Sequence, residues 1–193
     1  MAPHFKKVIA TDTSKKQLSL AKPHTNIPYQ ISSAEHTNFP DNSFDLITVA
    51  QAYHWFKFDE FEKEIRRVAK NNAVIAVWGY NLLSTNDAAI DALIKKFYTE
   101  IVDPYWDAER KYVDDNYNTV PFNFTPLPTK QFFIKTGWSK DGLIGYLNSW
   151  SSVQHFIDAK KYNPVDEIIH EVDNLWKDVR PVSFPLFLKL GRV

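Results

Sequence analysis

Two residues in the first third of the chain have side chains and neighbours that suit chemistry on a ligand. Asp12 directly follows the apolar run Val8-Ile9-Ala10-Thr11, and a carboxylate at the end of a buried strand can accept hydrogen bonds from ribose hydroxyl groups. His54 comes shortly after the run 44–50, and its imidazole titrates near neutral pH, as suits a general base. Asp12 is therefore a candidate for ligand binding and His54 a candidate for catalysis.

Both assignments have structural alternatives. An aspartate at a strand end often only caps the helix that follows, and a histidine beside tryptophan and phenylalanine is often a structural or pocket-lining residue. The same choice, between core and substrate-binding wall, holds for four aromatic residues near expected strand ends. These are Tyr53, Trp55, Trp78 and Tyr80.

The composition excludes several classes of protein. Lys plus Arg and Asp plus Glu each number 23, so the formal net charge is zero, and neither nucleic acid nor an anionic membrane surface is an expected partner. The chain has no cysteine, which rules out disulfides and thiolate ligands, and its histidines show no metal-ligand spacing, so we assign no metal. It contains neither a signal peptide nor an apolar stretch of membrane-spanning length, so we expect a cytoplasmic protein.

Strand and helix patterns alternate through the first half of the chain. The expected strands are residues 5–11, 29–31, 44–50 and 73–78. The expected helices are residues 14–22 and 59–70, the second with apolar residues at helical spacing. Such alternation predicts an α/β fold with a mostly parallel sheet that is flanked by helices.

The second half is less regular. The expected helices are residues 88–101 and 140–160 and a helix that starts at Pro164, and the expected strands are 130–135 and 184–190. Residues 102–128 lack periodicity and are rich in Pro, Asn, Asp and aromatic residues. Because a loop of this length in a compact domain usually has a function, we expect a lid or an acceptor wall, with an ordinary surface loop as the alternative.

The most diagnostic stretch of the chain is SAEHTNFPDNSFDLI at 33–47, followed by AQAYHWF at 50–56. It closely resembles the stretch of class I S-adenosylmethionine-dependent methyltransferases that leads into and out of their fourth strand. Within that class it is similar to methyltransferase type 11 proteins of the trans-aconitate methyltransferase-like branch. The runs DGLIGYLNSWS at 141–151 and FPLFL at 184–188 resemble the last helices and the final strand of the same branch. The resemblance implies a Rossmann-like methyltransferase fold with an antiparallel C-terminal strand, and S-adenosyl-L-methionine as cofactor.

Carried over residue by residue, the resemblance implies cofactor contacts at five positions. Asp12 would accept hydrogen bonds from the ribose hydroxyls of S-adenosylmethionine, and Thr13 would lie beneath the adenine. Ala34 and Glu35 would flank the adenine, with a solvated loop carboxylate as the alternative for Glu35. Gln51 would face the methionine portion and the transferred methyl group.

One part of the family's site has no counterpart in this sequence. No glycine occurs before Gly79, whereas the first strand of the family ends in an acidic, glycine-rich turn that holds the methionine amino and carboxylate groups. We interpret the chain as lacking this first strand, which in the family lies between strands two and four. We therefore expect the strands at 5–11 and 44–50 to close the gap directly, or a second copy of the chain to supply the pairing.

These observations favour an S-adenosylmethionine-dependent methyltransferase that acts on a small molecule, a carboxylate being one option, by in-line methyl transfer. We expect a single domain over 1–193, with a cofactor-side half at 1–80 and a substrate-side half at 81–193, and activity that is impaired without the glycine-rich turn. The alternative is a non-catalytic interaction or dimerisation module, with a homodimer through exposed sheet edges as an option. A nicotinamide-dependent oxidoreductase would explain Asp12 but not the run 34–56, so it ranks below both.

Overall fold

The computed structural model describes residues 2–193, which divide into two compact units. The first unit contains residues 2–77, 120–128 and 189–193, and the second contains residues 78–119 and 129–188. Two long strands, β4 (Ala69–Tyr80) and β7 (Arg180–Arg192), each contribute residues to both units. No helix within residues 2–193 is long and apolar enough to span a membrane.

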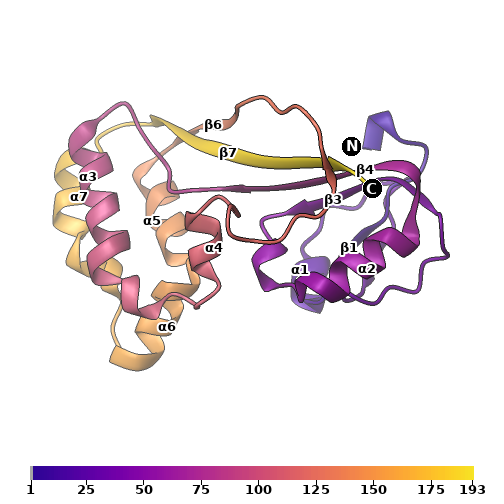
Figure 1. The fold of residues 1–193 in the computed structure, drawn as a ribbon. Helices are drawn as coiled ribbons and strands as arrows, with labels where there is room; N and C mark the ends of the chain where they lie inside the picture. The colour runs from indigo at the N-terminus through magenta and orange to yellow at the C-terminus, as the bar shows by residue number, and fades with distance from the viewer. Residues whose placement is uncertain (1) are drawn as a thin grey trace. The chain divides into compact units, whose positions relative to one another are not determined.

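The strands form a parallel pair and a larger mixed sheet (Figure 1). In the pair, β1 (Ala10–Asp12) runs parallel to β2 (Tyr29–Ile31). The larger sheet has the strand order β3-β4-β7-β5, and β6 also pairs with β7. Its remaining strands are β3 (Phe44–Ala50), β5 (Thr125–Pro126) and β6 (Phe132–Trp138). The C-terminal strand β7 runs antiparallel to both β5 and β6, which confirms the expected antiparallel C-terminal strand.

Strands β1 and β3 lie in different sheets, so the expectation that they pair directly is wrong. Within residues 2–193, β1 pairs only with β2, and β3 is an edge strand that pairs only with β4. β1 is three residues long, and Thr11 and Asp12 are exposed, so water can satisfy the backbone groups on its open edge. Pairing with a second copy of the chain stays a prediction.

Capping and apolar spacing determine the helices of the first unit. α1 (Lys15–Ser19) begins after Ser14, whose hydroxyl accepts a hydrogen bond from the Gln17 amide, as N-cap residues do. α2 (Phe58–Val68) buries the predicted apolar stripe. The stripe consists of Phe61, Ile65 and Val68. Short 3₁₀ helices occur at Ala2–His4 and Tyr53–Trp55.

Strand β4 starts immediately after α2, earlier than the strand predicted at 73–78. Asn72 has a left-handed backbone, with φ of 62°, a conformation that asparagine tolerates, but the strand continues through it. Ala73, Ile75 and Val77 are buried, and their burial holds the segment in the sheet. The predicted strand is therefore the buried part of a longer one.

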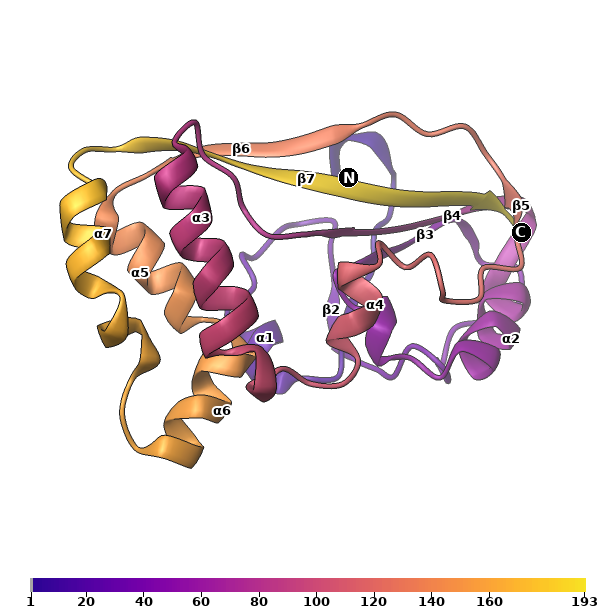
Figure 2. The same ribbon diagram turned by 60° about the vertical axis from the view of Figure 1, so that its left-hand side comes forward.

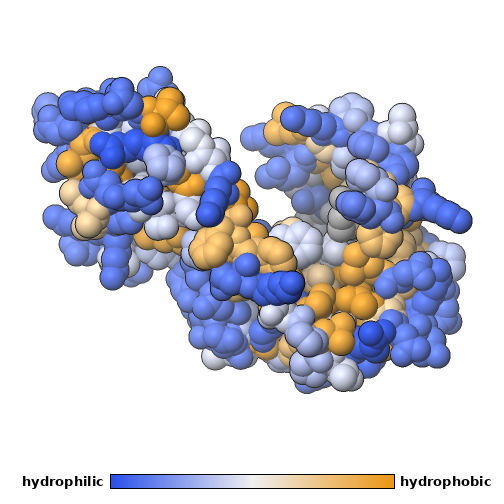
Figure 3. All heavy atoms as spheres, turned by 90° about the horizontal axis from the view of Figure 1, so that it is seen from above, coloured by the Kyte–Doolittle hydropathy of each residue, from blue (hydrophilic) through white to orange (hydrophobic). Residues whose placement is uncertain are grey.

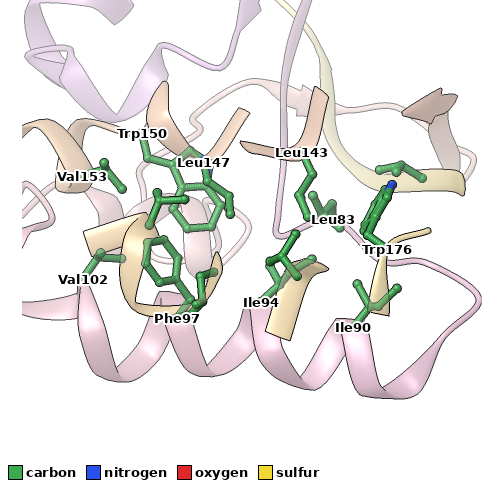
Figure 4. Close-up of a cluster of buried hydrophobic side chains, with 14 of the residues drawn as sticks. Leu83, Ile90, Ile94, Phe97, Val102, Leu143, Leu147, Trp150, Val153 and Trp176 are labelled. Atoms are coloured by element: carbon green, nitrogen blue, oxygen red, sulfur yellow. The ribbon is translucent and has the colours of Figure 1, made fainter. Parts of the chain in front are cut away.

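The second unit is built around an apolar core to which α3 (Ala88–Lys96) contributes one face. Figure 2 shows α3 beside α7 (Ile169–Leu175). The carboxylate of Asp87 caps the start of α3, and one π-helical turn, Phe97–Ile101, extends its end. Figure 4 shows side chains of this helix turned toward those of α5 (Lys140–Asn148). The core includes Ile90, Ile94, Phe97, Leu143, Leu147 and Trp150.

The single helix predicted for 140–160 is two helices, α5 and α6 (Ser151–Lys160). They separate at Trp150, whose backbone is extended, with φ of −69° and ψ of 136°, and whose side chain is buried. Packing of this large side chain overrides the helical periodicity. Further along, a short 3₁₀ helix, Pro164–Glu167, precedes α7 (Ile169–Leu175) where one longer helix was predicted.

The aperiodic segment 102–128 is more structured than an ordinary surface loop. It contains a 3₁₀ turn at Asp103–Tyr105, α4 (Arg110–Asp114) and the two residues of β5. Val102, Val113 and Tyr117 are fully buried, so the segment takes part in the packing of the protein. Its role as a lid or acceptor wall stays a prediction.

Large hydrophobic side chains reach the surface in both units, and Figure 3 shows one face on which hydrophobic residues lie among hydrophilic ones. In the first unit, Tyr29 and Ile31 of β2 are exposed. In the second, Phe132, Phe133 and Ile134 of β6 are exposed. Exposed strands with apolar side chains are places where other chains can pair.

Candidate functional site

Asp12 ends β1 next to the loop that follows β2. It lies opposite Ile31 in the strand register, and the Ser32 amide donates a hydrogen bond to its carbonyl oxygen at 3.2 Å. Its carboxylate Oδ1 accepts a hydrogen bond from the Ser14 amide at 2.7 Å, while Oδ2 has no hydrogen bond within residues 2–193. Asp12 and the neighbouring Thr13 are both exposed. Asp12 therefore helps to start α1 and still has a carboxylate oxygen open to a ligand.

Glu35 joins the loop after β2 to the start of α2. Its Oε2 accepts a hydrogen bond from the Ser33 hydroxyl, and its Oε1 accepts one from the Lys57 amide at 3.1 Å. Burial acts to raise the pKa of Glu35, but the hydrogen bonds from Ser33 and Lys57 outweigh it and leave the pKa below its usual value. Lys57 precedes α2 and makes no side-chain cap, so Glu35 supplies one. Ala34 beside it is partly buried.

An ion pair between the buried Glu64 and the half-buried Arg67 holds the same loop. Glu64 Oε1 accepts hydrogen bonds from the Thr37 amide at 2.8 Å and from Arg67 Nη2 at 2.7 Å, and its Oε2 accepts one from Arg67 Nε at 2.9 Å. The hydrogen bonds from Arg67, helped by those from Thr37, lower the pKa of Glu64 to about 2 although burial opposes them. The Glu64 side chain is only 8% exposed, so its carboxylate is shielded from water while it accepts two hydrogen bonds from the Arg67 guanidinium.

Arg67 also binds the backbone of the loop. Its Nη1 donates to the Phe39 carbonyl oxygen and to Asp41 Oδ1, each at 2.7 Å, and its Nη2 donates to the Thr37 carbonyl oxygen at 3.1 Å. The loop that carries the predicted adenine contacts is therefore fixed to α2 at several points. The sequence signal for this arrangement is a glutamate, Glu64, within the apolar stripe of α2 and an arginine three residues later.

Gln51 directly follows β3 and has a left-handed backbone with φ of 51°. For a residue other than glycine this conformation costs about 1–3 kcal/mol, and such strain concentrates at active sites and ligand clamps. Gln51 also lies at the carboxyl end of a strand, which is where ligands of open α/β sheets bind. Both features support the methionine-side position predicted for Gln51.

The three aromatic residues after Gln51 differ in their exposure. Tyr53 is buried, and its hydroxyl donates to the Pro121 carbonyl oxygen at 2.6 Å. These contacts favour the core interpretation of Tyr53, and its contact with a substrate stays a prediction. His54 is 8% exposed and its ring centre is 4.8 Å from that of Trp55, which is 54% exposed. Among these residues Trp55 is the one that presents its ring to solvent.

The structure brings Asp12 and Thr13 next to the loop that carries Ala34 and Glu35, through the hydrogen bond from the Ser32 amide to the Asp12 carbonyl oxygen. Glu35 in turn accepts a hydrogen bond from the amide of Lys57, which follows Gln51 in the chain. Two predicted substrate residues, Trp78 and Tyr80, belong to the second unit, where they end β4. Their side chains are partly buried, and the ring of Tyr80 meets that of Phe184 at 5.3 Å. Within residues 2–193 no cluster of His, Cys, Asp or Glu is arranged to hold a metal ion.

Comparison with known proteins identifies the family. Residues 1–77 match the family described as a methyltransferase domain. Over 201 aligned residues, the chain is 34% identical to a protein of Dictyostelium discoideum that is named as a methyltransferase, with 100% of this chain and 76% of that protein covered. A protein of Schizosaccharomyces pombe with a methyltransferase name is 27% identical and is covered over 68% of its length.

Solved structures agree with these relatives. A protein of Anaeromyxobacter dehalogenans named as a type II methyltransferase superposes with a TM-score of 0.89 and 33% identity, over 99% of this chain and 82% of that chain. The YcgJ protein of Bacillus subtilis superposes with a TM-score of 0.52 and 15% identity, over 98% of this chain and 83% of that one, which bears on the fold alone. The chain belongs to the class I S-adenosylmethionine-dependent methyltransferases and has their Rossmann-like fold.

Proposed function

We propose that this protein transfers the methyl group of S-adenosylmethionine to a small molecule. Membership of the family supports methylation that depends on S-adenosylmethionine. The main observation in support of a cofactor site is the exposed carboxylate of Asp12, which has one oxygen without a partner within residues 2–193. This carboxylate lies beside the anchored loop 32–43. Ligands of open α/β sheets bind at this end of the strands.

The residues present suit the nucleoside half of the cofactor. Asp12 Oδ2 can accept hydrogen bonds from a ribose, and the exposed Thr13 lies next to it. Ala34 and Glu35 lie on the loop that the Glu64 network holds in place, so they can form a preorganised adenine wall. No glycine within residues 2–193 has the left-handed backbone typical of a tight phosphate- or carboxylate-binding turn. We therefore infer that the described residues bind the nucleoside half and contribute little to the methionine carboxylate, so methyl transfer by this chain alone is impaired.

Methyl transfer mainly requires positioning. When bound, S-adenosylmethionine supplies an electrophilic methyl group for in-line displacement by the acceptor. The strained Gln51 would orient the methionine side, and the buried ring of His54 would accept a proton if the acceptor is a hydroxyl or an amine. A carboxylate acceptor needs no such base. The exposed Trp55 is suited to cover the acceptor.

Calorimetric titration with S-adenosylhomocysteine tests the cofactor site. We expect measurable binding to the unsubstituted chain and an affinity about tenfold or more lower in Asp12→Asn, because a charge-assisted hydrogen bond contributes about 1.5–3 kcal/mol. The amide oxygen of asparagine can still accept the Ser14 hydrogen bond, so α1 should form. Asp45→Asn is the matched control, since Asp45 is exposed and pairs with Lys70 on β4. Equal affinity of the Asp12 and Asp45 variants would refute the assignment of Asp12.

The second candidate function is a non-catalytic interaction or dimerisation module. It is favoured by the open edges of β1 and β3 and by the exposed Tyr29 and Ile31 on the neighbouring strand. A chain that forms a stable homodimer in sedimentation experiments and does not bind S-adenosylhomocysteine would support this candidate. A monomer that binds the nucleoside would support the methyltransferase.

A further inference from the structure

The second unit contains an arginine that is mostly buried yet has unused hydrogen-bond donors. Arg110 belongs to α4, and its side chain is 19% exposed. Its Nε donates to the Tyr98 hydroxyl at 2.7 Å and to Asp114 Oδ1 at 3.1 Å. The Tyr98 hydroxyl donates to the same Asp114 oxygen at 2.6 Å. This triangle of hydrogen bonds fixes the guanidinium in place.

The two η nitrogens of Arg110 have no acceptor within residues 2–193. Arg67 in the first unit provides the comparison, because it is more exposed, at 35%, yet each of its three nitrogens has an acceptor. Within residues 2–193, neither η nitrogen of Arg110 is among the buried side-chain atoms that lack a partner, so both are open to solvent. The unpaired η nitrogens of Arg110 therefore suit an anion that enters the site from solution.

Aromatic rings pack against this guanidinium. Its central carbon is 4.8 Å from the ring centre of Trp106 and 5.3 Å from that of Tyr98. Trp150 contributes a third ring, 5.6 Å from Trp106 and 5.7 Å from Tyr98, and Figure 4 shows Trp150 next to Leu147. Trp106 Nε1 is buried and has no hydrogen-bond partner within residues 2–193. The cluster thus combines apolar walls with a second unpaired donor.

The charges of the cluster favour a singly charged ligand. Asp114 already offsets part of the positive charge of Arg110, so a dianion would meet stronger repulsion than a monoanion. Burial, with the hydrogen bond to Asp114, raises the pKa of Tyr98. Burial, with the nearby Tyr80, raises the pKa of Tyr146 to about 12, although Arg110 opposes it. Both phenols are therefore neutral at physiological pH and add no negative charge.

We propose that Arg110 binds the carboxylate of a small molecule whose apolar body packs on Trp106 and Tyr98. A planar carboxylate can accept two parallel hydrogen bonds from a guanidinium, and small-molecule sites combine apolar walls with a few polar groups. The inference names the class of the methyl acceptor and in that respect rests on the proposed function. Binding at Arg110 can nevertheless be measured without methyl transfer.

Titration of the full chain with benzoate, trans-cinnamate and octanoate tests this site by calorimetry and tryptophan fluorescence. We expect at least one acid to bind, and its neutral amide to bind about tenfold or more weakly. Arg110→Lys keeps the charge but loses the planar fork, so we expect about tenfold weaker binding of the acid. The matched control is Arg66→Lys, because Arg66 also packs on a ring, 5.1 Å from that of Phe124, but hydrogen-bonds to Glu62 and the Asn123 carbonyl oxygen. We expect that control to bind the acid normally.

Several results would overturn the proposal. The first is that none of the three acids binds at millimolar concentration. The second is that an acid and its amide bind equally well, and the third is that Arg110→Lys and Arg110→Gln both bind the acid as tightly as the unsubstituted chain does. Tighter binding of phenyl phosphate than of benzoate would assign the site to phosphate instead. Circular dichroism establishes that each variant is folded. Binding of an acid without S-adenosylhomocysteine binding would contradict only the proposed function, and the reverse result would contradict only this site.

Discussion

The surroundings of Asp12, Glu35 and Arg110 determine what each charged side chain can bind. Asp12 uses one carboxylate oxygen to start α1 and exposes the other, whereas both oxygens of Glu35 already accept hydrogen bonds. Asp12 is therefore better suited to receive a ribose, and Glu35 to hold the neighbouring loop. Arg110 resembles Asp12 in having unused capacity, but with donors instead of acceptors.

Glu64 makes the stability of the first unit depend on pH. Its pKa in the folded protein is lowered from 4.5 to about 2 by Arg67 and Thr37. Because this value is below that of an unfolded glutamate, the stabilisation is complete above about pH 4.5 and is lost as the pH falls toward about 2. We expect Glu64→Gln to remove about 2–3 kcal/mol of the pH-dependent free energy of unfolding. Urea unfolding at a series of pH values measures it.

Glu60→Gln is the control for this prediction, because Glu60 lies on the same helix with a side chain that is 39% exposed. The control should keep the loss of stability in acid that the unsubstituted protein shows. A Glu64→Gln variant with the same acid dependence as the unsubstituted protein would contradict the role of the Glu64–Arg67 pair.

At the scale of elements, the end of β7 is packed too tightly for any side chain larger than that of glycine. A Cβ atom at Gly191 would lie 2.8 Å from Phe124 Cβ and 2.9 Å from Phe122 Cε1. We expect Gly191→Ala to lower the free energy of unfolding by about 1–3 kcal/mol, the usual cost of overpacking. Denaturant unfolding of the full chain measures the change.

Gly145 in α5 provides the opposite case with the same substitution. It is exposed, and nothing lies within 4 Å of a Cβ atom added there. Gly145→Ala should stabilise the protein by about 0.5–1 kcal/mol because alanine is the better helix former. Equal effects of the two substitutions would show that Phe122 and Phe124 do not restrict Gly191.

Local sequence patterns predicted some elements well and others poorly. The strand 44–50 was predicted at its observed bounds because its apolar run is continuous, whereas the helix 140–160 was not, because burial of Trp150 interrupts it. The cofactor candidates could be predicted from strand ends and from the family resemblance. A glutamate in the apolar stripe of α2 marks Glu64 as unusual, but the sequence does not reveal which loop it anchors, because Thr37 lies 27 residues away. The cluster around Arg110 could not be predicted, because no local pattern shows which donors of an arginine stay without an acceptor.

At the scale of the whole molecule, we propose that each unit binds one of the two ligands that methyl transfer requires. The first unit carries the strand ends and the anchored loop that suit a nucleoside. The second carries the aromatic cluster around Arg110, which suits an apolar carboxylate. Family membership supports S-adenosylmethionine-dependent methylation by the chain.

The central claim is that the nucleoside binds at the strand ends of the first unit. The most direct test follows the amide chemical shifts of the chain during a titration with S-adenosylhomocysteine. We expect the largest changes at residues 12–14, at 33–35 and around Gln51, with little change in β6 of the second unit. Saturable changes confined to other residues, or no change at residues 12–14 and 33–35 at ligand concentrations that saturate the calorimetric signal, would contradict the proposed cofactor site.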